Sequence, residues 1–252
     1  MSRKIFYVLA CLIIWTTSTV AEPNIVETAY RGVASESVTE MKDRIFGTPI
    51  TVFDADYRRQ AVAALPEDVR RKKFVEGNLW RHVEAVTRPV FQLHNRTNKL
   101  ELLLYHDQVP VAMVWRGCIL AMSDSLASSL SDEQLAGIIA HELAHAYFMD
   151  ETVAFEKSGD QEGLRVVELK CDAVAMLTLK LLGSDPANFV SALRKIAILV
   201  VSKDYTSNSW RHPRLSEREK FSRRFITLLN KGERSAGYSS GLRRGSRAFA
   251  FV

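Results

Sequence analysis

The chain has 252 residues, of which 47% are hydrophobic and 25% are charged, and this composition predicts one compact globular domain with a sizeable core. The formal net charge is +5, but the excess of basic residues lies near the two ends of the chain. Arg3 and Lys4 lie near the start, and residues 231–252 hold five basic residues against one acidic residue. The stretch between these ends is close to neutral and has no stripe of aromatic and basic residues, so no nucleic-acid partner is expected.

The first 21 residues have the pattern of a signal peptide. Basic residues come first, an unbroken apolar run follows from Ile5 to Trp15, and Thr19 and Ala21 offer the small residues that a signal peptidase needs. The apolar run is 11 residues long, whereas a membrane span needs about 20. We therefore expect an exported protein that is cleaved after Ala21 and keeps no transmembrane segment. A secreted protein and a protein anchored in the membrane by an uncleaved signal are the alternatives to a periplasmic protein.

The next part of the chain is expected to be helical in places. Residues 22–50 are mixed and polar, and no element is predicted there. A short helix is predicted over residues 54–65, and apolar residues recur at helical spacing over residues 69–93. Gly77 and Pro89 interrupt this second pattern, so a kinked or split helix is expected.

Short apolar runs then predict three strands, over residues 100–105, 111–115 and 119–122. Helical periodicity returns in four segments, over residues 132–148, 166–182, 189–201 and 213–230. Ser131 and Gln134 form a candidate capping box at the start of the first of these helices. The predicted fold class is α+β and predominantly α, with residues 22–98 as an N-terminal helical part, residues 99–230 as the core, and residues 231–252 as a disordered basic tail.

The pattern with the clearest chemistry is His141-Glu142-Leu143-Ala144-His145, in the helix predicted over residues 132–148. Two histidines four residues apart lie on one helical face and can bind a single ion through their ring nitrogens. Glu142, between them, can take a proton from a water that a metal activates. The pattern therefore predicts a metal centre with its own base.

A second segment supplies the missing metal ligand. Glu168 follows His145 at a distance that allows a loop and an antiparallel return helix. Asp172 lies one turn further on the same face, where it can accept a hydrogen bond from the outer nitrogen of a ligating histidine. Two His, one Glu and one open position are typical of the catalytic zinc site of a peptide hydrolase, with one Zn²⁺ per chain. The alternative is that both histidines are ordinary residues of a partly exposed helix.

Four stretches of the chain resemble gluzincin metallopeptidases of the HtpX and CAAX-prenyl-protease type, including their secreted and periplasmic BepA- and LoiP-like members. These stretches are residues 117–123, 135–145, 168–175 and 212–218, in the family's order. The resemblance implies a zincin-like metallopeptidase domain with a small sheet and an active-site helix. It also implies polypeptide substrates and a role in envelope protein quality control, with a bacterial periplasm as the setting.

The resemblance implies further site residues. His212 would lie near the zinc, as an oxyanion-side donor or an extra ligand, and Arg218 would support the site. An extended substrate would be held by backbone pairing along one strand, namely by Val111, Ala112, Met113 and Val114. The chain departs from the family here, because relatives often carry Asn-Ala where this sequence has Val111-Ala112. It also lacks the transmembrane helices and the helical-repeat domain of some members.

Three functional hypotheses follow from the sequence: an endopeptidase, an exopeptidase, and a chaperone-like zinc protein that His212 keeps closed as a fourth ligand. After signal removal two cysteines remain, Cys118 and Cys171, so one disulfide or two buried thiols are equally open. The basic tail is a candidate for weak contact with a membrane surface or an acidic partner. Three histidines lack partners at ligand spacing and are interpreted as surface or core residues: His82, His94 and His106.

Overall fold

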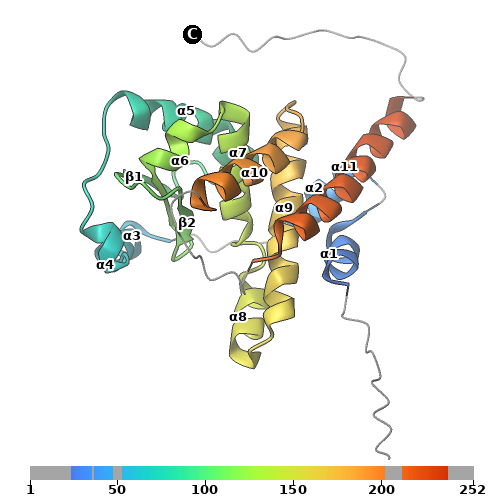
Figure 1. Ribbon diagram of the computed structural model, residues 1–252, viewed down its shortest axis with the longest axis horizontal. Helices are drawn as coiled ribbons and strands as arrows, with labels where there is room; N and C mark the ends of the chain where they lie inside the picture. The colour runs from blue at the N-terminus through green and yellow to red at the C-terminus, as the bar shows by residue number, and fades with distance from the viewer. Residues whose placement is uncertain (1–23, 36, 48–52, 202–211, 238–252) are drawn as a thin grey trace, which may run out of the picture.

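The computed structural model describes residues 24–35, 37–47, 53–201 and 212–237. Both the predicted signal peptide and the last 15 residues of the predicted tail, 238–252, lie outside the described residues. Within the described part, helices surround a small three-stranded sheet, so the predicted fold class, α+β and predominantly α, is confirmed (Figure 1). None of the helices in these ranges is both long and apolar enough to cross a membrane.

The helices that precede the sheet in the described part are α1 (Ile25–Val33), α2 (Val38–Phe46), α3 (Ala55–Ala63), α4 (Glu67–Arg70) and α5 (Asn78–Leu93). The strands are β1 (Glu101–Tyr105), β2 (Ala112–Trp115) and β3 (Ile119–Ser123). After the sheet come α6 (Asp124–Ser129), α7 (Asp132–Ala144), α8 (Met149–Ser158), α9 (Gln161–Leu181), α10 (Ala187–Val201) and α11 (Leu215–Gly237).

The three strands and the helices α3 and α10 agree with the sequence prediction to within two residues at each end. The pattern over residues 69–93 is split, as expected, because α5 begins only after Gly77, whose φ is +83°. Pro89 lies inside α5 and does not end it. Four helices were not predicted: α1, α2, α6 and α8.

Three of the predicted helix ends were wrong. The helix α7 stops at Ala144 instead of residue 148, because the next turn tightens: the N–H of Tyr147 donates to the Ala144 carbonyl, three residues back. The helix α9 starts five residues early, at Gln161, where the Asp160 side chain accepts a hydrogen bond from the Gly163 N–H at 2.8 Å. The helix α11 continues to Gly237, past the expected start of the tail.

The sheet has the strand order β1-β3-β2, so β2 is an edge strand. Strand β1 runs parallel to β3, and β2 runs antiparallel to it with Ala112 opposite Met122. The Ser123 N–H donates to the Val111 carbonyl at 2.9 Å. Because inward and outward backbone groups alternate along an antiparallel strand, the N–H and C=O groups of Ala112 and Val114 point to the outer edge.

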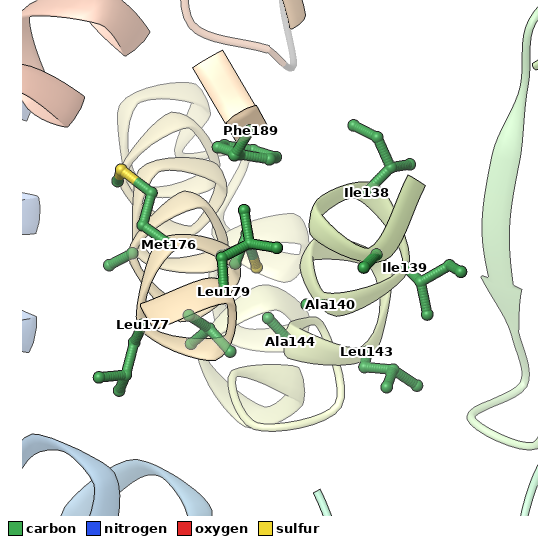
Figure 2. Packing of buried hydrophobic residues seen from close by; sticks show 14 of the residues in the cluster. Ile138, Ile139, Ala140, Leu143, Ala144, Met176, Leu177, Leu179 and Phe189 are labelled. Carbon is green, nitrogen blue, oxygen red and sulfur yellow. The ribbon is translucent and has the colours of Figure 1, made fainter. Parts of the chain in front are cut away.

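Helix α7 lies between the sheet and α9 (Figure 1). It approaches α9 closely because small residues line the contact: a Cβ added at Gly137 would lie 3.2 Å from Leu179 Cδ1 and 3.3 Å from Phe189 Cβ. Figure 2 shows Ala140 and Ala144 on the side of α7 that faces α9. This close contact brings together the helices that carry the two predicted ligand segments.

A polar cluster is buried where the end of α5, the turn after α7 and α9 meet. His94 Nδ1 lies 2.9 Å from the Tyr147 hydroxyl, and His94 Nε2 lies 2.8 Å from Thr178 Oγ1. Burial, assisted by the charge of Arg96, lowers the pKa of His94 to about 3. The ring is therefore neutral near pH 7, and one of its nitrogens donates while the other accepts.

We expect acid to destabilise the fold through His94. Its pKa rises from about 3 in the folded chain to 6.5 in the unfolded chain, so below pH 6.5 only the unfolded state gains a proton. At about 1.4 kcal/mol per pH unit, lowering the pH from 7 to 5 should cost about 2 kcal/mol of unfolding free energy. Urea unfolding at both pH values tests this: the wild type should lose about 2 kcal/mol more than His94→Gln. Equal losses would contradict a neutral, buried His94.

Candidate metal centre

Helix α7 presents the first two residues of the His-Glu pattern. Its N-terminus is fixed by the predicted capping box, in which Ser131 Oγ accepts from the Gln134 N–H at 3.4 Å and Gln134 Oε1 accepts from the Ser131 N–H at 3.1 Å. His145 follows the last helical residue but keeps helical dihedral angles, φ −54° and ψ −28°. His141 and His145 therefore remain one helical turn apart.

Three donor groups converge between α7 and α9. One ligand atom from each of His141, His145 and Glu168 can be chosen so that all three lie within 4.8 Å of one another. His141 Nε2 is 3.5 Å from one carboxylate oxygen of Glu168, and His145 Nε2 is 3.7 Å from the other. Two imidazole nitrogens and a carboxylate form a donor set that suits Zn²⁺.

The outer nitrogen of His141 faces a buried ion pair. Its Nδ1 lies 2.9 Å from an oxygen of Asp172, whose side chain is fully buried. Arg218 Nε donates to the other Asp172 oxygen at 2.8 Å, and the Arg218 Nη2 donates to the oxygen near His141. Asp172 therefore links the His141 ring to α11.

His212 contacts the Glu168 carboxylate. Its Nδ1 lies 3.0 Å from Glu168 Oε2, while its side chain is 53% exposed. His212 does not belong to the group of donors that lie within 4.8 Å of one another. His212 therefore contacts Glu168 from the side of the carboxylate that faces the solvent.

Glu142 points from α7 towards the edge of the sheet. Burial raises the pKa of this half-buried carboxyl group to about 7, and the nearby Glu168 adds to the rise. The Val114 backbone N–H donates a hydrogen bond to it and partly offsets the rise. This contact agrees with the strand alternation, which turns the Val114 N–H outward, and it places Glu142 beside the free edge of β2.

The two histidines of the pattern have opposite pKa shifts. Burial lowers the pKa of His145 to about 4, which keeps its ring neutral. Burial also disfavours the charged form of His141, but Asp172 and Glu168 outweigh it and raise the pKa of His141 to about 9. Burial disfavours charged Glu168 too, yet its bonds to His141 and His212 hold its pKa well below the usual range. Metal binding would therefore release a proton from His141.

Both cysteines of the described chain are free thiols. Cys118 belongs to a small apolar cluster around β3 with Leu65 and Val69, and Cys171 belongs to the main core. The Cys171 sulfur lies 3.6 Å from His145 Nδ1. Of the two alternatives that the sequence left open, the structure has two buried thiols.

One site residue was missed by the sequence analysis. Phe189 of α10 stacks on the His141 ring with centroids 5.8 Å apart and planes 19° apart. The Arg218 guanidinium lies 5.8 Å from the centroid of the Phe189 ring. Phe189 is fully buried. Its sequence signal is that of any apolar residue in an amphipathic helix, so only the tertiary arrangement reveals this contact.

A carboxylate and three side chains that could hold a metal ion, set beside an edge strand, indicate a metallopeptidase. The family model of peptidase family M48 matches residues 76–162, which confirms the resemblance inferred from the sequence. The matched segment includes His141, Glu142 and His145, whereas Glu168 lies beyond it and joins the site through the fold. A comparison with curated proteins found no match.

Proposed function

We propose that the chain is a zinc-dependent peptidase in which His141, His145 and Glu168 hold one Zn²⁺. The convergence of these three donors from two packed helices is the observation that carries the proposal, and the M48 match supports it. When bound, zinc would supply Lewis-acid chemistry: it lowers the pKa of a bound water to about 7 and polarises the substrate carbonyl.

Glu142 is the proposed general base. Its pKa of about 7 suits a group that must both take up and give back a proton at neutral pH. The carboxylate would accept the proton of the attacking water and then return it to the leaving amine. The hydrogen bond from the Val114 N–H orients this carboxylate towards the strand edge, where the scissile bond would lie.

The proposed substrate is an extended polypeptide on the outer edge of β2. The outward N–H of Ala112 and the outward C=O groups of Ala112 and Val114 offer backbone hydrogen bonds, as in other cases of strand addition. Pairing of this kind recognises the middle of a chain and needs no terminal charge. This supports an endopeptidase over an exopeptidase.

The alternative of a closed zinc protein requires His212 as a fourth ligand. The 3.0 Å contact between His212 Nδ1 and Glu168 supports a different role, in which His212 holds the carboxylate in place. We further propose export to a bacterial periplasm and a role in envelope protein quality control. The signal-like sequence supports export, and family resemblance alone supports the cellular role.

Metal removal and the His212→Ala variant test the proposed function together. The wild type should carry one zinc per chain and cleave casein, a chelator should abolish cleavage, and added Zn²⁺ should restore it. His212→Ala should lower cleavage about 10-fold, since partners of metal ligands contribute on that scale. A rise in cleavage would instead identify His212 as a latch. Bound zinc without cleavage in either form would refute the peptidase proposal.

A further inference from the structure

We infer that Cys171 is a positioning residue for His145, whose outer ring nitrogen donates a hydrogen bond to the Cys171 sulfur. The inference rests on the proposed zinc site and deepens it. The Cys171 Sγ lies 3.6 Å from His145 Nδ1, a normal separation for a hydrogen bond to sulfur. The other nitrogen of the same ring, Nε2, faces Glu168, where the metal would bind.

One turn of α9 carries three side chains that contact or complete the proposed zinc site. Glu168, Cys171 and Asp172 stand at positions i, i+3 and i+4, so they share one face of the helix. Glu168 supplies the ligand carboxylate, Asp172 contacts the outer nitrogen of His141, and Cys171 contacts the outer nitrogen of His145. The Cys171 thiol therefore contacts the outer nitrogen of His145 just as the Asp172 carboxylate contacts the outer nitrogen of His141.

The protonation of a ligating histidine explains why the sulfur matters. A neutral imidazole that binds metal through Nε2 carries its proton on Nδ1, and this N–H needs an acceptor to fix the tautomer and the ring angle. Among the described hydrogen bonds, Cys171 is the partner of that nitrogen. Sulfur is a weaker acceptor than a carboxylate, so His145 is held less firmly than His141.

The chain offers a matched control for this inference. Cys118 is also a fully buried free thiol, but it belongs to the apolar cluster around β3 with Leu65 and Val69, and its sulfur contacts the Trp115 carbonyl. Cys118→Ala and Cys171→Ala therefore remove the same atom from two buried sites. Only the second change removes a partner of the proposed metal centre.

The test is the zinc dissociation constant, measured by competition with a chromogenic chelator, for the purified chain and its variants. Cys171→Ala should weaken zinc binding about 10-fold, and Cys118→Ala should leave it unchanged. Cys171→Ser, which keeps an acceptor, should bind zinc more tightly than Cys171→Ala. Cys171→Val removes the acceptor while filling the space, so it repeats the test if the alanine variant does not fold.

Two results would overturn the inference. One is a zinc dissociation constant for Cys171→Ala and Cys171→Val equal to that of the wild type. The other is equal weakening by Cys118→Ala, which would show a general packing effect. A wild-type chain that binds no zinc would instead refute the proposed function, and the inference with it, so the two failures are distinguishable.

Discussion

Replacing Glu142 with Gln is expected to remove peptide cleavage and leave the zinc bound. The change preserves the size of the side chain and its position between the ligand histidines, but the amide cannot take up a proton. General bases contribute about 10²–10⁴ in rate, so casein cleavage should fall by at least about 100-fold. The metal content of the purified variant, measured by mass spectrometry, should stay at one zinc per chain.

A matched control for this variant lies on the same helix. Glu133→Gln makes the same chemical change in the first turn of α7, at an exposed position, and should keep wild-type cleavage. Near-normal cleavage by Glu142→Gln with zinc in place would contradict the proposed role of Glu142. Loss of zinc from this variant would also count against it, because a base that is not a ligand should not be needed to hold the ion.

Replacing Arg218 with Met should destabilise the fold by about 3–5 kcal/mol, the usual cost of breaking a buried ion pair on one side. Asp172 is fully buried and Arg218 is 14% exposed, so the remaining carboxylate would keep only His141 as a charged partner in a place that water does not reach. Because Asp172 also faces His141 Nδ1, zinc binding should weaken as well. Urea unfolding measures the first effect and chelator competition the second.

Two further variants separate the ion pair from general effects of removing charge. Arg223→Met, on the same helix, loses an exposed arginine whose partner is Glu219 at 3.8 Å, and it should change stability by less than about 1 kcal/mol. The double variant Asp172→Asn/Arg218→Met removes both charges and should recover much of the loss. A loss below about 1 kcal/mol for Arg218→Met alone would show that Asp172 is not held by this pair.

The pattern that predicts a metal site could be recognised in the sequence because its geometry is local. Helical periodicity alone puts His141 and His145 on one face, and it does the same for Glu168 and Asp172. The capping signal at Ser131 also depends on neighbours in the chain, and the structure has it as predicted. Strong local signals of this kind do not need the tertiary fold.

The remaining contacts depend on how distant segments pack. Phe189 reaches His141 only because α10 crosses both α7 and α9, and no pattern in its own helix distinguishes it from other buried residues. The helices α1 and α2 were not predicted because residues 22–50 are mostly polar. Each of these helices buries only a few apolar residues, which pack against α9 and its neighbours. The end of α7 was missed because the turn at Tyr147 is stabilised by tertiary contacts with His94.

Crystallography with anomalous scattering at the zinc edge would show whether His141, His145 and Glu168 bind a catalytic zinc. We predict one peak per chain between His141 Nε2, His145 Nε2 and the Glu168 carboxylate, at about 2.0–2.2 Å from each donor, with the fourth position open to water. A peak with His212 as the fourth ligand would contradict an open catalytic site. The absence of any peak at these residues, in protein purified with zinc, would contradict zinc binding at this site.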